Sequence, residues 1–175
     1  MNIPNSITFI RVVLIPVFIG LMNYGHYRAA LVVFIIACLT DALDGLIARL
    51  TNTKTELGAF LDPMADKLLI VSSFVTLALL GKAPAWLLLI VISRDVILLL
   101  GSMVIYFTGH KLIIQPSIPG KVTTFCQLLV VTLTLVLIAY GIKSTVIMQG
   151  TYWLTAGVTI FSGVQYIHRG MRLMT

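Results

Sequence analysis

Four aspartates gather in one short window of a strongly apolar chain. They form two pairs, with spacings of three and four residues: Asp41 and Asp44, then Asp62 and Asp66. Residues spaced in this way share one face of a helix, so each pair can present two carboxylates to one cavity. All-oxygen donors suit hard divalent cations such as Mg²⁺, Mn²⁺ or Ca²⁺. Two such ions about 3.5–4 Å apart are a recurrent means of holding a diphosphate, so the window predicts phosphoryl or phosphatidyl transfer.

The rest of the composition indicates that these carboxylates lie in a membrane protein. Of 175 residues, 59% are hydrophobic and 10% are charged, against roughly 25% charged in a soluble domain. The mean hydropathy is +1.05. Apolar runs of about 20 residues, the length needed to cross a bilayer, recur along the chain. Five of the six acids, the four aspartates and Glu56, lie in the one window, and acids inside a membrane are costly unless a cation or counter-charge compensates them.

We therefore expect an all-α integral membrane protein with six transmembrane helices, forming a single domain over residues 1–175. Clusters of glycine, proline and polar residues separate the apolar runs. The predicted helices span 6–24, 28–50, 59–81, 84–108, 118–141 and 147–168. A short link then joins the second helix to the third, which makes them antiparallel neighbours and lets the four carboxylates converge.

The basic residues predict the orientation of these helices. With the N-terminus in the cytoplasm, seven lysines and arginines fall on that side and three on the other, in keeping with the positive-inside rule. The cytoplasmic set is Arg11, Arg49, Lys54, Lys111, Lys121, Arg169 and Arg172, and the opposite set is Arg28, Lys82 and Lys143. Both termini, and a polar cavity holding the aspartates, are then expected on the cytoplasmic side. For a chain of bacterial appearance, that places the protein in the inner (plasma) membrane.

The net charge of +6 does not indicate a nucleic-acid protein. The basic residues are dispersed among apolar helices and form no aromatic-interleaved patch. Anionic lipid head groups or phosphorylated substrates explain them better. Cys38 and Cys126 lie in predicted spans without a metal-binding spacing, so we interpret them as small core hydrophobes.

Small and basic residues accompany the aspartates at fixed distances. The pattern D-x2-D-G-x2-A-R-x8-G-x3-D-x3-D is complete, and its other members are Gly45, Ala48, Arg49 and Gly58. Residues 45 and 48 leave room for a ligand beside the helix, and a guanidinium at 49 can clamp a phosphate. This pattern resembles the signature of the CDP-alcohol phosphotransferase (phosphatidyltransferase) family, and the six predicted spans resemble its core over nearly the whole chain.

The resemblance implies a reaction and roles for these residues. Two divalent cations, Mg²⁺ or Mn²⁺, would be held by the four aspartates, and Asp66 would also be the general base. CDP-diacylglycerol would bind at Gly45, Ala48, Arg49 and Gly58. The opening segment, with Asn5 and Thr8, is similar to that of bacterial phosphatidylglycerophosphate synthases, where it helps to wall the nucleotide pocket. Members of the family tend to be homodimers, which is the assembly expected here.

The acceptor alcohol depends on two further basic residues, Arg94 and Lys121. Resemblance to phosphatidylglycerophosphate synthases implies that both bind the phosphate of glycerol-3-phosphate. Alternatively, Arg94 pairs with Asp95 and Lys121 is an interfacial lysine whose amine reaches the head groups. The run Ser93-Arg94-Asp95 departs from the usual Arg-Glu pair and also resembles cardiolipin synthases of the same family, which accept phosphatidylglycerol. Glycerol-3-phosphate is the favoured acceptor, with phosphatidylglycerol as the alternative.

Two classes other than enzymes compete with this interpretation. A cation-coupled transporter could use intramembrane carboxylates, but transporters often carry matching features in repeated halves. Here the acids cluster in one hairpin and the later spans hold no counterpart. A lipid scaffold would leave the eight-residue pattern unexplained.

Overall fold

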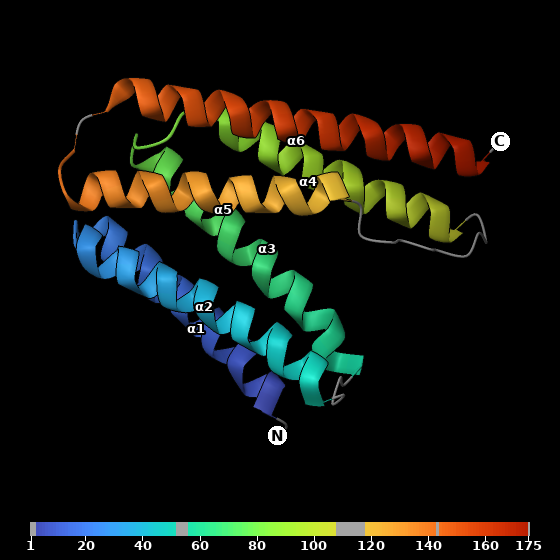
Figure 1. The fold of residues 1–175 in the computed structure, drawn as a ribbon, viewed down its shortest axis with the longest axis horizontal. Helices are drawn as coiled ribbons and strands as arrows, with labels where there is room; N and C mark the ends of the chain where they lie inside the picture. The colour runs from blue at the N-terminus through green and yellow to red at the C-terminus, as the bar shows by residue number, and fades with distance from the viewer. Residues whose placement is uncertain (1–2, 52–55, 108–117, 143, 175) are drawn as a thin grey trace. The chain divides into compact units, whose positions relative to one another are not determined.

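The computed structural model describes residues 3–51, 56–107, 118–142 and 144–174. Within these ranges the side chains of 3–9, 41–51, 56–66, 102, 104–107, 169 and 171–174 lie outside the description. Over the described residues the protein is all-helical, with six helices and no strand, as predicted. The helices are α1 (Ile3–Asn23), α2 (Tyr27–Thr51), α3 (Glu56–Leu79), α4 (Ala85–Phe107), α5 (Ile118–Ala139) and α6 (Thr145–Met174) (Figure 1).

Helix bounds fall within three residues of the prediction except at the C-terminus. There α6 continues to Met174, six residues beyond the predicted end at 168. The added segment contains arginine, methionine and leucine, which are good helix formers, and a single glycine does not stop a helix that is otherwise favourable. The apolar pattern locates a membrane span, whereas helix propensity alone extends the helix beyond it.

Three helices end in the same glycine-dependent turn. Gly25, Gly81 and Gly141 have φ angles of 77°, 64° and 68°, in the left-handed region that glycine adopts without strain. After each glycine the next backbone N–H donates to a carbonyl five residues earlier, with N···O distances of 2.8, 2.8 and 2.9 Å. This is the Schellman motif, which provides partners for carbonyls that a helix end would otherwise leave exposed. These turns end α1, α3 and α5.

The described helices form two compact units. Unit 1 contains Met1–Ala83 and Val131–Lys143, and unit 2 contains Pro84–Val130 and Ser144–Thr175. Helix α5 therefore contributes its first part to unit 2 and its last part to unit 1. A single domain over residues 1–175 stays a prediction.

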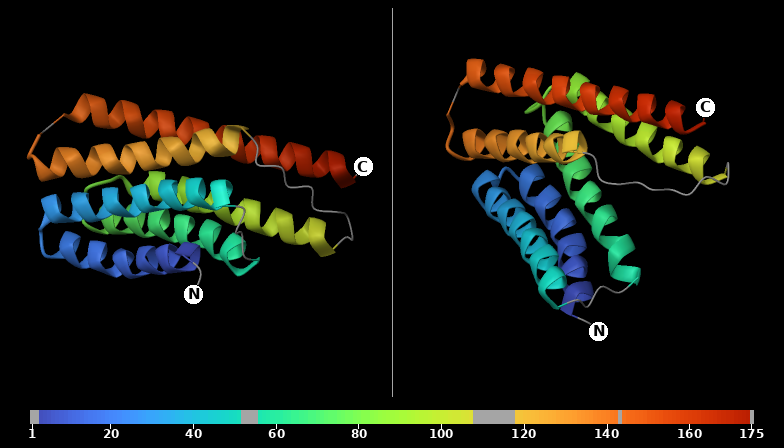
Figure 2. Two further views of the ribbon diagram at one scale, coloured as in Figure 1. Left: turned by 60° about the horizontal axis from the view of Figure 1, so that its bottom comes forward. Right: turned by 45° about the vertical axis from the view of Figure 1, so that its right-hand side comes forward.

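In unit 1, α1 packs against both α2 and α3 (Figure 2). The rings of Phe18 and Phe34 lie 5.8 Å apart between α1 and α2. The core is built mainly from aliphatic and phenylalanine side chains. Its buried members include Phe18, Met22, Phe34, Ala37, Leu69, Phe74, Leu77, Val131 and Leu135. Buried hydroxyls in α3 bond back to their own helix, as Ser73 Oγ does to the Leu69 carbonyl at 2.7 Å.

In unit 2, α4 and α6 pack side by side and run in the same direction, so that contacts follow one another in the same order along both helices. Trp86 and Trp153 stack with centroids 5.0 Å apart. Farther along, the Tyr166 hydroxyl donates to the Leu98 carbonyl at 3.3 Å. A Cβ added at Gly101 would lie 2.8 Å from Cε1 of Tyr166, so the helices approach closely because residue 101 has no side chain.

Large apolar side chains remain exposed along the helices of both units. Examples are Leu39, Leu89, Phe125, Leu154 and Phe161, each more than half exposed. A soluble monomer rarely exposes so much apolar surface, whereas lipid-facing helices must. Within the described residues, α5 is the one helix long and apolar enough to cross a membrane, with a mean hydropathy of 2.3. Shorter apolar stretches occur at Ile10–Asn23, Tyr27–Thr40 and Lys67–Leu79. The fold is thus consistent with a membrane protein, and six complete crossings stay a prediction.

Candidate active site

The aspartate window occupies the facing ends of two consecutive helices. Asp41 and Asp44 belong to α2, and Asp62 and Asp66 belong to α3. Both helices are continuous, so the members of each pair are about one helical turn apart, as the spacing predicted. Four residues separate Thr51 from Glu56, which limits the distance between these helix ends to about 18 Å. The side chains of all four aspartates lie outside the described residues, so their role as metal ligands stays a prediction.

The nucleotide-binding residues predicted from the sequence fall on the same end of unit 1. The first turns of α1, the last turns of α2 and the first turns of α3 meet there in every view (Figures 1 and 2). The side chains of these residues also lie outside the description. On α1 they are Asn5 and Thr8, on α2 Gly45, Ala48 and Arg49, and on α3 Gly58. The packing of α1 on α2 and α3 brings these helix ends to one end of unit 1, and their joint role in nucleotide binding stays a prediction.

Unit 1 also contains a buried arginine. Arg11 lies on α1 one turn beyond Thr8 and is fully buried, with 0% of its surface exposed. A buried guanidinium is costly unless carboxylates or other acceptors surround it. Arg11 therefore belongs with the polar end of unit 1. The signal in the sequence was an arginine inside an apolar run.

Arg94 is held in unit 2 by two interactions. Its side chain is nine-tenths buried between α4 and α6. One terminal nitrogen donates to Asp95 Oδ1 at 2.8 Å, forming an ion pair, and the other donates to Ser162 Oγ at 3.3 Å. The buried Nε has no acceptor among the described residues. Arg94 pairs with Asp95, as one of the two alternatives predicted, and its binding of an acceptor phosphate stays a prediction.

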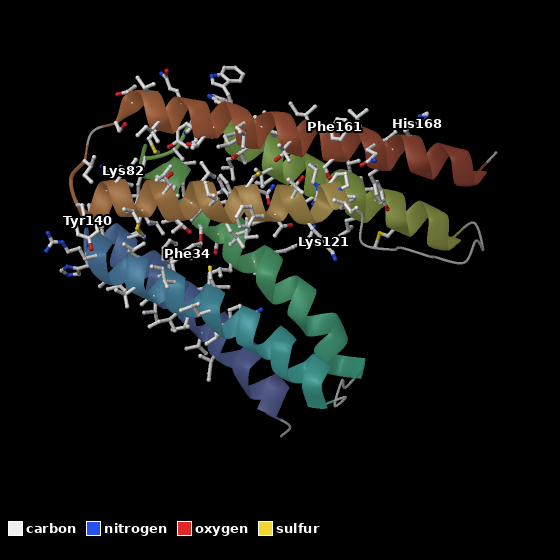
Figure 3. The ribbon with its side chains drawn as sticks, in the orientation of Figure 1. Phe34, Lys82, Lys121, Tyr140, Phe161 and His168 are labelled. Carbon is white, nitrogen blue, oxygen red and sulfur yellow. The ribbon has the colours of Figure 1, made fainter. Side chains whose placement is uncertain are left out.

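Lys121 has a different environment. It lies in the first turn of α5 and is exposed (Figure 3). Among the described side chains, Lys121 and Arg94 share no hydrogen bond. The interfacial interpretation of Lys121 is thus as compatible with the structure as a role in binding the acceptor.

A row of buried polar side chains near Arg94 was missed by sequence reasoning. On α6 the row contains Thr155, Thr159 and Ser162, spaced by four and three residues on one face, and each is at most 4% exposed. Thr123 of α5 reaches the carbonyl of Val158 at 3.4 Å. The spacing of the hydroxyls along α6 could have revealed this polar face of the helix.

A pocket of about 400 Å³ lies at the other end of unit 1. It is lined by Gly25, His26, Tyr27, Arg28, Ala29 and Ala139. Arg28 donates through Nε to the Ala139 carbonyl at 3.3 Å and lies 5.7 Å from the Tyr140 ring centre. Lys82 lies 5.6 Å from the Tyr27 ring centre, and Figure 3 shows Lys82 and Tyr140 at this end. These cations cap a helix and contact aromatic rings, as in an interfacial belt, and are separate from the candidate active site.

Comparison with known proteins identifies the family. Residues 1–161 match the family model for CDP-alcohol phosphatidyltransferase. The chain belongs to this family. Membership supports the enzyme interpretation over a transporter or a scaffold, and it makes the protein a CDP-diacylglycerol-dependent phosphatidyltransferase.

Similar proteins include two phosphatidylglycerophosphate-forming enzymes and a cardiolipin synthase. A probable phosphatidylglycerophosphate synthase of Mycobacterium tuberculosis is 35% identical over 98% of this chain and 82% of the relative. A CDP-diacylglycerol–glycerol-3-phosphate 3-phosphatidyltransferase of Bacillus subtilis is 32% identical over 96% and 94%. The human cardiolipin synthase (CMP-forming) is 33% identical over 98% of this chain and 62% of the relative.

The donor set of this phosphatidyltransferase fits the metals that its family generally uses. Members of the family generally depend on divalent metal ions. Four carboxylates supply only oxygen, the donor that hard divalent cations prefer. Among the described side chains no group of three or more histidine, cysteine or acidic residues could hold a metal. The aspartate window therefore remains the candidate metal centre.

Proposed function

We propose that this protein transfers the phosphatidyl group of CDP-diacylglycerol to glycerol-3-phosphate, giving phosphatidylglycerophosphate and CMP. The observation that carries the proposal is the complete eight-residue signature, with all its members at the ends of α2 and α3 in a chain of this family. The acceptor is taken from the names of relatives in Mycobacterium tuberculosis and Bacillus subtilis.

The cofactor of the proposed reaction is a pair of divalent cations, Mg²⁺ or Mn²⁺. Their ligands would be the four aspartates of the window: Asp41, Asp44, Asp62 and Asp66. When bound, such ions neutralise diphosphate charge and stabilise the leaving oxygen. Gly45 and Ala48 keep the face of α2 open for the nucleotide, and Arg49 would bind the diphosphate. Gly58, Asn5 and Thr8 would complete the CDP-diacylglycerol site.

Asp66 would act as the general base. It takes the proton of the acceptor hydroxyl, and the oxygen forms a new bond to the phosphorus that carries diacylglycerol. The bond between that phosphorus and the bridging oxygen breaks, and CMP leaves with the electron pair. Arg94 and Lys121 would bind the acceptor's phosphate and hold its hydroxyl in place. Transfer in one direct step is the simplest scheme that balances these atoms.

The proposed setting is the inner (plasma) membrane, with several crossings and the active site facing the cytoplasm. Six crossings would return the chain to its starting side, so both termini would lie on one face of the membrane. The seven-to-three distribution of basic residues supports the cytoplasm as that face. A cytoplasmic site would meet the water-soluble acceptor directly. Membrane lipids surround the protein, a homodimer is the proposed assembly, and nucleic acid is not a partner.

A second acceptor is favoured by one observation. Asp95 already neutralises Arg94 at 2.8 Å, which reduces the positive charge offered to a doubly charged phosphomonoester. Phosphatidylglycerol carries a singly charged phosphodiester and needs less compensation. The human cardiolipin synthase is as similar in sequence as the other relatives. Cardiolipin synthesis from phosphatidylglycerol is therefore the alternative function.

One assay tests both functions. The purified protein receives CDP-diacylglycerol and Mg²⁺ or Mn²⁺, with glycerol-3-phosphate and phosphatidylglycerol in parallel reactions. We expect CMP release with glycerol-3-phosphate and a phosphatidylglycerophosphate product by mass spectrometry. Cardiolipin as the main product would select the alternative. Folded protein that releases no CMP with either acceptor would overturn both.

A further inference from the structure

Two of the five N–H groups of the Arg94 guanidinium donate to side chains of the protein. Asp95 accepts from one terminal nitrogen and Ser162 from the other, at 2.8 and 3.3 Å. The side chains of Arg94 and Asp95 are 10% and 16% exposed, so water screens this pair only weakly. Nε is buried and has no acceptor among the described residues. Arg94 is thus held at two points, by one carboxylate and one hydroxyl.

The two contacts have different physical consequences. Ser162 is neutral and lies on another helix, so its hydroxyl fixes the direction of the guanidinium without changing the charge of the site. Next to it, a Cβ at Gly163 would lie 3.7 Å from Arg94 Cγ, an ordinary contact that leaves the stem in place. Asp95 carries a full negative charge beside the guanidinium. It therefore changes the field that a bound anion experiences.

That field acts unequally on the two candidate acceptors. A phosphomonoester carries about 1.5 to 2 negative charges at pH 7, whereas a phosphodiester carries one. Coulomb repulsion from Asp95 grows in proportion to the acceptor's charge, so it weakens binding of the monoester more. Neutralising Asp95 would increase the attraction of the site for both anions, with the larger gain for the monoester.

We propose that Asp95 is a specificity-determining residue that sets the charge preference of the acceptor site, and that Ser162 is the positioning residue for Arg94. The proposal rests on the proposed function, in which Arg94 binds the acceptor's phosphate. Asp95 lowers the preference of the site for phosphomonoester acceptors relative to phosphodiester acceptors. Ser162 supports binding of both kinds equally.

The test compares kcat and KM for glycerol-3-phosphate and phosphatidylglycerol in the full-length protein and its variants. In Asp95→Asn the amide oxygen can still accept from Arg94, so shape is retained while the charge is lost. The measured quantity is kcat/KM for glycerol-3-phosphate divided by kcat/KM for phosphatidylglycerol. We expect this ratio to rise about tenfold, because the KM for glycerol-3-phosphate falls. Asp95→Glu keeps the charge and should restore the wild-type ratio. If the wild-type protein uses only one acceptor, the inhibition constant of the other replaces its KM.

Two further variants separate charge from structure. Ser162→Ala should raise the KM for both acceptors by at least about tenfold, the cost of one hydrogen bond to a charged group, and should leave the ratio of the two kcat/KM values unchanged. Ser162→Thr should recover binding. Gln149→Lys adds one positive charge at the exposed start of α6, about 20 Å along the helix from Ser162, and should leave the ratio unaltered.

The outcomes distinguish this inference from the proposed function. Absence of CMP release in the wild-type protein would refute the function itself. An active Asp95→Asn protein whose ratio stays within twofold of wild type, or falls, would overturn the role of Asp95. If Asp95→Asn does not yield monodisperse protein, Asp95→Ser removes the same charge with a smaller side chain. The ratio of the two kcat/KM values is then measured in Asp95→Ser and judged by the same criterion.

Discussion

At the scale of single residues, the polar groups of this protein are few and concentrated. Arg11 and Arg94 are buried guanidiniums, one in each unit, in a chain with only 10% charged residues. Charges inside an apolar protein are retained where binding or catalysis needs them. At Arg94, one carboxylate and one hydroxyl accept hydrogen bonds from the buried guanidinium.

The first prediction concerns Asp66, the proposed general base. Asp66→Asn preserves size but cannot take a proton at neutral pH, so we expect kcat to fall by about 10² to 10⁴. Binding of CDP-diacylglycerol should change much less, because three other carboxylates of the window remain. CMP release measures the first effect, and competition with labelled CDP-diacylglycerol measures the second. Turnover near the wild-type rate would remove Asp66 from the role of base.

At the scale of elements, glycine decides where helices stop and how closely they pack. Glycines in the left-handed region end α1, α3 and α5 with the same pair of backbone hydrogen bonds. Between α4 and α6, Gly101 makes room for the ring of Tyr166, whose hydroxyl is anchored on the Leu98 carbonyl. Small residues of this kind let membrane helices approach, because packing replaces the hydrophobic effect inside lipid.

The second prediction tests this contact between α4 and α6. Gly101→Ala would place a methyl group 2.8 Å from Tyr166 Cε1, so either the Tyr166 ring or one of the two helices must shift. We expect a loss of about 1 to 3 kcal/mol of stability, seen as a lower unfolding temperature in detergent. Gly157→Ala on α6 is the matched control. Nothing lies within 4 Å of its added Cβ, so it should be neutral or stabilising. Equal effects of the two changes would contradict the packing described.

At the scale of the whole molecule, six helices bring distant segments of the sequence together. The first turns of α1 and the facing ends of α2 and α3 meet at one end of unit 1. Residues about 50 positions apart in sequence, from the opening segment to the second aspartate pair, therefore share one region. Unit 2 independently places Arg94 of α4 against Ser162 of α6, 68 residues away.

The third prediction concerns metal dependence of the complete enzyme. Removing divalent cations with EDTA should reduce CMP release by at least about 100-fold, because four carboxylates alone would repel the diphosphate. Addition of Mg²⁺ or Mn²⁺ in excess should restore activity without refolding. Activity that persists in EDTA after extensive dialysis would argue against a metal-dependent site. Monitoring helicity by circular dichroism separates loss of metal from loss of fold.

The sequence alone determined the number of helices, most of their bounds and the family. Apolar run length, turn residues and signature spacing are local properties, and each is readable within a few tens of residues. The spacing of Asp41 and Asp44, for example, already specified one helical turn, and α2 is continuous there.

Tertiary structure alone decided the environments of Arg11, Arg94 and Lys121. From the sequence, Arg94 could either pair with Asp95 or bind the acceptor phosphate. Only the packing of α4 on α6 places Ser162 Oγ within hydrogen-bond distance of a terminal nitrogen of Arg94. The sequence left open that Arg11 is fully buried and which of two environments Lys121, which is exposed, would have. Burial depends on which helices cover a residue. That is a property of contacts between segments distant in the chain, and no local pattern encodes it.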